Sequence, residues 1–273
     1  MDSHGEPLAR SALSLLALWL VIALSANAQQ SPLRIAAAAD LQPILPSVLE
    51  QFQQSTGIHA DVTYQASAAL ATQILNGAPF DLFLSADLAY PKRLIDAGVA
   101  DTAGVLNSTG FSDSSTPVTY ARGTLVLWTR KDSQWPAPSL ATLRDSRLRR
   151  LAIANPERAP YGKAAIAALT SLNLVTSLQQ KLVTAENISQ AAQFAETANA
   201  DAGLISLTSA VTPHLASIGS YFVLPKDLYP PIEQGAVLIT NSGQRRNAHK
   251  FLDFLLSAPI QQQLLKSGLT PVK

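Results

Sequence analysis

The feature that most constrains the fold of this chain is a repeated unit of an apolar strand, a short loop and an amphipathic helix. Residues 33–37 form a short apolar run, and after Asp40 apolar residues recur at helical spacing until Ser55-Thr56-Gly57. The unit recurs with strands at 59–64 and 80–84 and helices at 70–75 and 90–97. Three such units within about 65 residues predict a parallel sheet with helices on its faces.

The rest of the chain repeats this scheme after residues 101–119, which are polar, lack periodicity and are predicted to form a surface loop. Strands are predicted at 125–128, 151–154, 202–206, 221–224 and 236–240, and helices at 140–145, 163–172, 175–182, 188–197, 247–256 and 259–267. The pattern predicts two α/β lobes, joined by crossover strands at 120–130 and about 225–240. Lobe I is expected to begin with 29–120, lobe II to span 121–225, and 226–273 to return to lobe I as a crossover strand and C-terminal helices.

The first 28 residues have the pattern of a secretory signal peptide. Arg10 precedes an apolar run at 12–24, which ends in Ser25-Ala26-Asn27-Ala28. The run is short for a transmembrane helix, and polar residues follow it at once. We therefore expect cleavage after Ala28, a periplasmic mature protein, and no stable membrane insertion after cleavage.

Charge and composition weigh against several classes of function. Without residues 1–28, 19 of the 20 basic and 17 of the 19 acidic residues remain, and the basic ones cluster only at 144–150, predicted to be a solvated loop. Such a balance gives no case for nucleic-acid binding. There is no cysteine, and His59, His214 and His249 are widely spaced, so neither a disulfide nor a metal site is predicted. We expect a monomer without a cofactor.

The turns between strands and helices carry the candidate binding residues. They are Ala38-Ala39-Asp40, 65–68, Pro160-Tyr161-Gly162 and 186–188. The first N–H groups of a helix lack intrahelical acceptors and the helix dipole makes that end positive, so oxyanions bind there. If two lobes face each other, these turns converge on one cleft.

The residues in these turns are mostly small and neutral. Small side chains let backbone N–H groups approach a ligand, Ser67 adds a hydroxyl, and Ser206 at a strand end can add another. Lys163 lies inside its helix and Arg158 is expected at a solvated rim. The sequence thus predicts an oxyanion site built from neutral donors.

Several motifs resemble those of the periplasmic molybdate-binding proteins of ABC importers, along nearly the whole mature chain. They are A-A-A-A-D-L at 36–41, Ser67 with Leu70 and Gln73-Ile74, G-A-P-F-D-L-F-L-S-A-D at 77–87, N-P-E at 155–157, P-Y-G at 160–162 and A-E-N-I at 185–188. The resemblance implies a type II periplasmic-binding-protein fold, with two lobes and the ligand in the cleft between them. It implies no enzymatic activity, but capture of molybdate and tungstate for an ABC permease and its ATPase subunit.

Carried over by position, the resemblance implies ligand contacts from Asp40, Ser67, Tyr161, Ile188 and Ser206. Tyr161 and Ile188 would contribute main-chain N–H groups, and Ser67 both its N–H and its hydroxyl. The sequence departs from the family at two of these positions. Family members often have a neutral hydroxyl or amide residue where this chain has Asp40, and some have a tyrosine where it has Ser206.

Asp40 allows three interpretations. The favoured one is a helix N-cap whose carboxylate accepts the N–H of Gln42 or a neighbour, with Pro43 early in the helix. In the second, Asp40 accepts a proton carried by the ligand, which would favour a phosphate-like anion. In the third, Asp40 is itself protonated and donates to the ligand.

Alternative functions remain open at this point. Another oxyanion such as sulfate would suit the same neutral donors, and a phosphate-like ligand would follow if Asp40 faced it. A periplasmic hydrolase is less favoured, because the chain lacks the G-x-S-x-G, S-x-x-K, H-E-x-x-H and P-loop motifs. A regulatory ligand-sensing domain is disfavoured by the signal peptide and by the lack of a DNA-binding segment.

Overall fold

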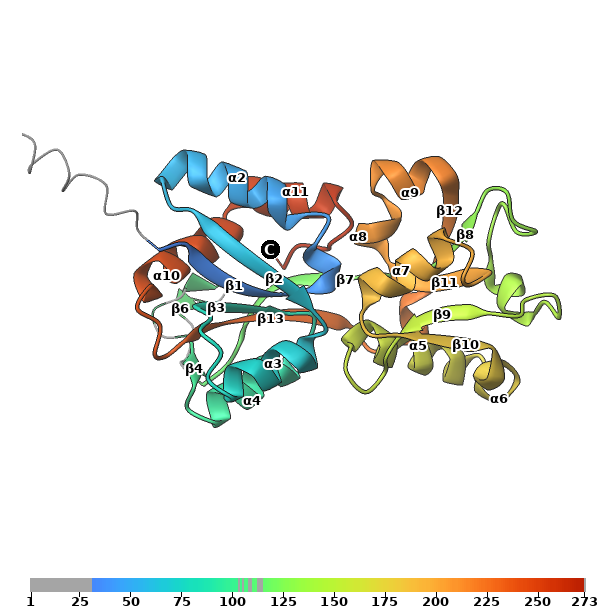
Figure 1. Ribbon diagram of the computed structural model, residues 1–273, viewed down its shortest axis with the longest axis horizontal. Coiled ribbons are helices and arrows are strands. Elements are labelled where there is room, and N and C mark those ends of the chain that lie inside the picture. Colours follow the sequence, from blue (N-terminus) through green and yellow to red (C-terminus); the bar gives the residue numbers. More distant parts are fainter. Residues whose placement is uncertain (1–30, 103, 105, 108–109, 112–114, 273) are drawn as a thin grey trace, which may run out of the picture. The chain divides into compact units, whose positions relative to one another are not determined.

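The computed structural model describes residues 31–102, 104, 106–107, 110–111 and 115–272. The predicted signal peptide at 1–28 lies outside the described residues. Residues Leu33–Lys273 form one compact unit that contains two main sheets (Figure 1).

The first sheet has the strand order β2-β1-β3-β13-β4, and β7 also pairs with β13. Its strands are β1 Leu33–Ala38, β2 Ala60–Gln65, β3 Leu82–Ser85, β4 Ala100–Asp101, β7 Val118–Gly123 and β13 Ile232–Ile239. β1 is parallel to β2 and β3, whereas β13 is antiparallel to β3, β4 and β7. A separate small hairpin consists of β5 Leu106–Asn107 and β6 Gly110–Phe111.

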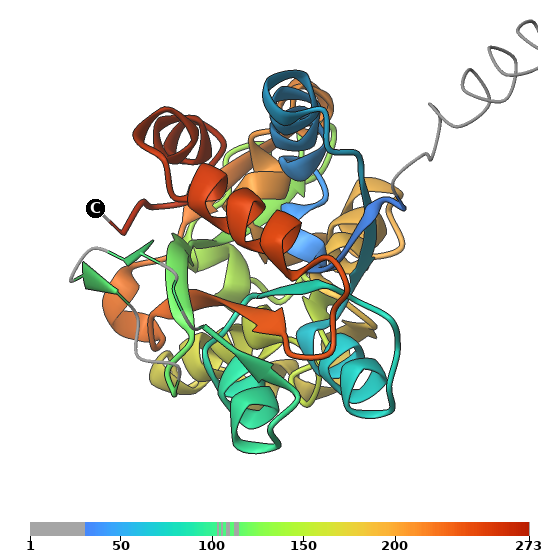
Figure 2. The same cartoon turned by 90° about the vertical axis from the view of Figure 1, so that its left-hand side faces the viewer.

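Helices cover both faces of the first sheet (Figures 1 and 2). They are α2 Leu45–Thr56, α3 Ser67–Leu75, α4 Ala89–Asp96, α10 Arg245–Leu255 and α11 Ala258–Lys266, with a 3₁₀ turn, η2, at Ala39–Leu41. On one face α2 packs on α10, where the rings of Phe52 and Phe251 meet edge to face at 5.1 Å. The other face buries Leu70 of α3 and Leu94 of α4.

The second sheet has the order β10-β9-β11-β8-β12. Its strands are β8 Leu125–Arg130, β9 Leu151–Ala154, β10 Leu182–Ala185, β11 Ala202–Ser206 and β12 Gly219–Val223. The helices that accompany it are α5 Pro160–Ser171, α6 Val175–Leu178, α7 Ile188–Glu196, α8 Leu207–Ala210 and α9 Pro213–Ile218, with 3₁₀ turns η3 Leu140–Arg144, η4 Gln179–Lys181 and η5 Lys226–Leu228. The predicted two-lobed α/β fold is confirmed, but both sheets are mixed and not mostly parallel. β9, β10 and β11 are parallel, whereas β8 is antiparallel to β11 and β12.

The chain passes between the two sheets twice. It leaves the first sheet after β7 and enters the second at β8, with Thr124 between them, and it returns through 224–231 from β12 to β13. The lobe limits predicted at 120/121 and 225/226 lie close to these changes of sheet. Since β7 and β13 pair with each other, the two connections run side by side.

The structure differs from the sequence prediction in short elements. The segment 101–119, predicted to be a loop, contains the start of β7 and the β5–β6 hairpin, and residue 182 begins β10 and does not end a helix. Helices α8 and α9 were not predicted, because four and six residues are too short to show a helical period. Their N-caps are Ser206 and Thr212, whose side chains accept backbone N–H groups.

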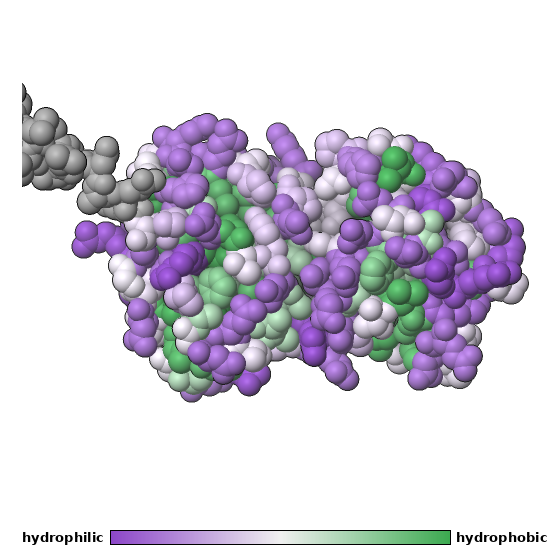
Figure 3. Space-filling model, viewed as in Figure 1, coloured by the Kyte–Doolittle hydropathy of each residue, from purple (hydrophilic) through white to green (hydrophobic). Residues whose placement is uncertain are grey.

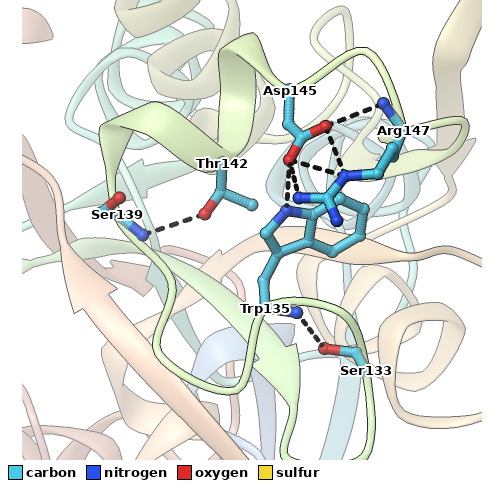
Figure 4. Close-up of polar contacts among 6 residues, drawn as sticks. All are labelled: Ser133, Trp135, Ser139, Thr142, Asp145 and Arg147. Atoms are coloured by element: carbon cyan, nitrogen blue, oxygen red, sulfur yellow. Dashed lines mark hydrogen bonds and ion pairs between the residues drawn. The ribbon is translucent and has the colours of Figure 1, made fainter.

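In the basic segment at 144–150, the Asp145 carboxylate holds Arg147 in place, as Figure 4 shows. Asp145 accepts hydrogen bonds from the guanidinium of Arg147 and, at 3.0 Å, from Trp135 Nε1. The Arg147 guanidinium lies 5.8 Å from the centre of the Trp135 ring. These contacts, chiefly the hydrogen bonds from Arg147, hold the pKa of Asp145 well below its usual range. Arg147 therefore has fixed partners in a segment predicted to be a solvated loop.

The surface is predominantly hydrophilic on the face shown in Figure 3, where apolar residues are interspersed with polar ones. The large hydrophobic side chains that are exposed in the described part of the chain are Tyr221, Val223 and Leu265. Among the described residues, none of the helices combines the length and the apolar composition needed to cross a bilayer.

Candidate functional site

A small pocket lies where the carboxyl ends of strands from both sheets meet, as expected for an α/β fold. It encloses about 200 Å³ of empty space, part of which is open to solvent. The lining residues are Ala38, Ala39, Asp40, Gln65, Ala66, Ser67, Ala86, Ala159, Pro160, Tyr161, Asn187 and Ile188. All four predicted turns contribute to it, so the pocket brings together Asp40, Ser67, Tyr161 and Ile188.

Three helices begin at this pocket. α3 begins at Ser67, α5 at Pro160 and α7 at Ile188. The backbone N–H groups in the first turn of each helix have no acceptor within the helix, and the dipole gives that end partial positive charge. Tyr161 follows Pro160, which has no N–H, so its own N–H is the first donor of α5. The pocket wall therefore presents N–H groups of Ser67, Tyr161 and Ile188.

Ser67 lines the pocket, and one hydrogen bond holds its hydroxyl. Its oxygen accepts the backbone N–H of Ala86 at 3.1 Å, and the side chain is 1% exposed. Among the described residues, none accepts a hydrogen bond from this hydroxyl. A hydroxyl whose oxygen is already occupied in this way is set to donate to a ligand.

Asp40 lies in η2, and its predicted role as an N-cap is wrong. The N-cap of η2 is Ala38, which forms no side-chain cap, and α2 begins only at Leu45. The Asp40 carboxylate turns to the strands that cross between the sheets. Its Oδ2 accepts hydrogen bonds from Tyr161 Oη at 3.1 Å and from Gln234 Nε2.

The Asp40 carboxyl group is fully buried, and burial raises its pKa to about 6. Desolvation disfavours the charged form, and the hydrogen bonds from Gln234 and Tyr161 offset it only in part. Its second oxygen, Oδ1, is buried without a hydrogen-bond partner. The carboxylate reduces the acidity of its neighbours, since burial and the Asp40 charge raise the pKa values of Tyr120 and Tyr161 well above their usual range.

Ser206 is the one predicted ligand residue that does not line the pocket. It is fully buried, accepts the N–H of Ser209 as the N-cap of α8, and lies 2.8 Å from Thr208 Oγ1. Thr208 Oγ1 in turn donates to the backbone carbonyl of Asp40 at 2.8 Å. Ser206 is therefore connected to η2 through Thr208, by two successive hydrogen bonds.

Short hydrogen bonds join the two sides of the pocket. Ser189 Oγ donates to the carbonyl of Ala39 at 2.8 Å, and the N–H of Ala68 donates to the carbonyl of Arg158 at 3.2 Å. The cationic groups nearest in sequence lie outside the lining: Arg158 pairs with Glu186, and the Lys163 ammonium lies 5.0 Å from the centre of the Tyr90 ring. The donors of the pocket are thus neutral.

Sequence reasoning missed the residues that support the pocket from behind. Gln234 holds Asp40 from β13, and Gly123 of β7 leaves room for the Tyr161 hydroxyl, which would lie 2.2 Å from a Cβ at that position. Gln234 is 0% exposed in a strand whose later residues are apolar, and such a buried amide is a signal for a specific partner. The sequence could not identify that partner, because Asp40 is almost 200 residues away.

Comparison with known proteins identifies the family of this chain. The family model described as bacterial extracellular solute-binding protein matches residues 33–270. Molybdate-binding protein ModA of Azotobacter vinelandii is 34% identical over 253 residues, 91% of this chain and 95% of that protein. ModA of Rhodobacter capsulatus is 33% identical over 252 residues, 92% of this chain and 93% of that protein.

A solved structure shares the fold. The Azotobacter vinelandii periplasmic molybdate-binding protein superposes with a TM-score of 0.79 at 28% identity, covering 88% of this chain and all of that one. The matched family consists of solute-binding proteins and is not an enzyme family. Because the family model matches residues of both sheets and two ModA relatives are more than 30% identical to the chain, the chain belongs to the family of bacterial extracellular solute-binding proteins.

Proposed function

We propose that this protein captures molybdate, and also tungstate, in the periplasm and delivers it to an ABC importer. The observation that carries the proposal is the pocket lined by three helix N-termini and the Ser67 hydroxyl, with no lysine or arginine among its lining residues. Backbone N–H groups at helix N-termini bind tetrahedral oxyanions through partial charges. The named function of the two ModA relatives supports molybdate as the anion.

The proposed donors differ in kind. Ser67 supplies its N–H and its hydroxyl, whereas Tyr161 and Ile188 supply main-chain N–H groups. Asp40 lines the same pocket. For Ser206 we propose a structural role outside the pocket, because its hydroxyl is engaged in capping α8.

The proposed cycle follows from the two-lobed fold. Hydrogen bonds from both halves close over the pocket, so ligand release requires the halves to separate about the paired strands β7 and β13. We propose that a membrane permease with its ATPase subunit receives the anion. The predicted signal peptide suits a receptor that moves freely in the periplasm, and we propose that it acts as a monomer.

A panel of anions in a thermal-shift assay tests the choice of ligand. Molybdate and tungstate are expected to raise the melting temperature at micromolar to millimolar concentrations, because a ligand at a hundred times its Kd stabilises the folded state by about 2.7 kcal/mol. Sulfate and phosphate serve as competitors of the same shape. A shift with phosphate or sulfate but none with molybdate would contradict the proposed ligand.

Ser67→Ala is expected to weaken molybdate binding by about 1.5–3 kcal/mol, the range for a hydrogen bond to a charged group. Isothermal titration calorimetry at fixed pH measures the change in Kd. Ser206→Ala is the matched control, since it removes a buried hydroxyl outside the pocket. It should cost about 1 kcal/mol of stability as a lost N-cap and change Kd less than twofold. Equal losses of affinity in both variants would place Ser206 in the site.

A further inference from the structure

The buried carboxyl group of Asp40 has no cationic partner. Its Oδ2 receives only neutral donors, Tyr161 Oη from α5 and Gln234 Nε2 from β13. No lysine, arginine or histidine contributes to its electrostatics within the described part of the chain. By contrast, Asp87, which lies beside the pocket, is partly stabilised as an anion by the charge of Lys163.

The groups that face Asp40 from the surrounding elements are all neutral at physiological pH. The ionisable ones are tyrosines, Tyr161 of α5 and Tyr120 of β7, and Tyr229 stands behind Tyr161. The others are the Gln234 amide, the Thr208 hydroxyl of α8, which donates to the Asp40 carbonyl, and the Ser189 hydroxyl of α7, which donates to the carbonyl of Ala39. The cations on these elements have other partners, since Lys163 of α5 lies over the Tyr90 ring and Arg122 of β7 pairs with Glu233, and neither contributes to the pKa of Asp40.

A dianion in this pocket would share its wall with this carboxylate. Two unit charges about 4 Å apart repel by about 4 kcal/mol at an effective dielectric constant of 20, and a dianion doubles that figure. Protonation of Asp40 removes this repulsion. Near neutral pH, the free energy needed to protonate the carboxylate is smaller than the repulsion that is removed. We propose that the oxyanion binds together with one proton, which is taken up by the Asp40 carboxyl group.

The geometry indicates which oxygen carries the proton. Oδ2 accepts two hydrogen bonds and so is suited to remain an acceptor, whereas Oδ1 is buried without a partner. A proton on Oδ1 turns this orphaned acceptor of a lining residue into a donor. Tyr161 and Gln234 act as positioning residues, because they fix the orientation of the carboxyl group. This inference rests on the proposed function only in that the ligand is a dianion.

The expected pH dependence has a definite sign. Asp40 in the free protein has a pKa of about 6, so it is mostly ionised at pH 7 and above. If the complex holds the protonated form, each pH unit above about 6.5 should lower the affinity about tenfold. Below pH 5.5 the free protein is already protonated, and the affinity should level off. Molybdate carries no proton of its own in the neutral range, so any uptake belongs to the protein.

Calorimetric titration of the mature wild-type protein with molybdate measures proton uptake directly. The observed binding enthalpy is plotted against the ionisation enthalpy of the buffer, and the slope gives the number of protons taken up per anion bound. We expect a slope close to one at pH 8 and well below one half at pH 5.5. A slope near zero at pH 8, with Kd unchanged between pH 7 and pH 8, overturns the inference. Absence of any molybdate binding contradicts the proposed function instead, and the same titration is then made with whichever dianion shifts the melting temperature.

Asp40→Asn separates uptake by this carboxyl from uptake elsewhere. The amide can keep an acceptor toward Tyr161 and Gln234 and carries a donor without titrating. It should abolish proton uptake and the pH dependence of Kd, and at pH 8 it should bind molybdate at least tenfold more tightly than the wild type. Asp87→Asn is the matched control and should retain the wild-type slope. Proton uptake that persists in Asp40→Asn overturns the assignment to Asp40, and if that variant fails to fold, the wild-type slope still decides.

Discussion

Replacing Gly162 by alanine is expected to lower the free energy of unfolding by about 2–3 kcal/mol and to weaken oxyanion binding together with it. A Cβ at this position would lie 2.3 Å from the carbonyl oxygen of Ala154 and 2.8 Å from the carbonyl carbons of Ala154 and Asn155. These are backbone atoms of β9 and the loop that follows, so they cannot rotate away. Overpacking of this kind costs about 1–3 kcal/mol, and contact with backbone places Gly162 at the upper end.

Binding should suffer for a separate geometric reason. To relieve the clash, the first turn of α5 has to move away from the end of β9, and the N–H of Tyr161 moves with it. A displaced donor loses much of its hydrogen bond, since these bonds weaken steeply with distance and angle. We therefore expect Kd for molybdate to rise at least tenfold under conditions in which the variant is still folded.

Gly243→Ala is the control for the loss of a glycine as such. A Cβ at Gly243 would meet no atom within 4 Å, and the residue does not have a positive φ. Urea unfolding of both variants gives their stabilities, and calorimetry at pH 7 without urea gives their Kd for molybdate. If Gly162→Ala matches Gly243→Ala in both measurements, the close approach of α5 to β9 is not what positions the donor.

The sequence predicted the larger elements because their burial is periodic. Strands 151–154 and 202–206 were predicted with the bounds that the structure has, since each is a short apolar run between loops. The helix ending before Gly57 was also recognisable, because Gly57 adopts a φ of 72° that favours glycine. Local signals of this kind need no knowledge of distant residues.

The pocket was predictable only in part, for a physical reason. Helix N-termini can be located from strand and turn patterns, and so the lining positions of Ser67, Tyr161 and Ile188 follow from local sequence. The environment of Asp40 does not, because its partners come from positions 161 and 234 and are brought near by the crossover strands. An aspartate just before a helical pattern looks like an N-cap unless those partners are known.

Tyr161 connects the pocket to the strands that cross between the sheets. Its backbone begins α5 at the pocket, while its hydroxyl reaches Asp40 and lies against Gly123 of β7. Movement of β7 relative to α5 would therefore disturb the Tyr161–Asp40 hydrogen bond and the pocket wall at once. If the two halves separate as proposed, this side chain would couple their opening to the proposed protonation of Asp40.

Ile188→Pro is expected to weaken molybdate binding by about 3 kcal/mol or more, the upper end of the range for a hydrogen bond to a charged group. Ile188 is the first residue of α7, where proline is tolerated because the N–H has no intrahelical acceptor. The preceding Asn187 has φ of −149° and ψ of 177°, an extended conformation of the kind that a residue before proline adopts. The substitution thus deletes one N–H and leaves the helix able to form.

The effect should exceed that of Ser67→Ala, because the proline ring does more than remove a donor. Its Cδ methylene group takes the place of the N–H hydrogen. This group is bulkier than the hydrogen and carries no partial positive charge to balance that of an anion oxygen. Ile188→Val keeps the N–H and most of the side chain that α7 buries, so it should cost about 0.5–1.5 kcal/mol of stability and change Kd less than twofold. Calorimetry on the wild type, Ile188→Pro and Ile188→Val separates the loss of the N–H donor from the loss of side-chain packing. Circular dichroism shows whether the variants remain folded. A Kd for Ile188→Pro within threefold of Ile188→Val would mean that the N-terminus of α7 does not contact the anion, and the pocket would then have to hold its ligand through α3 and α5 alone.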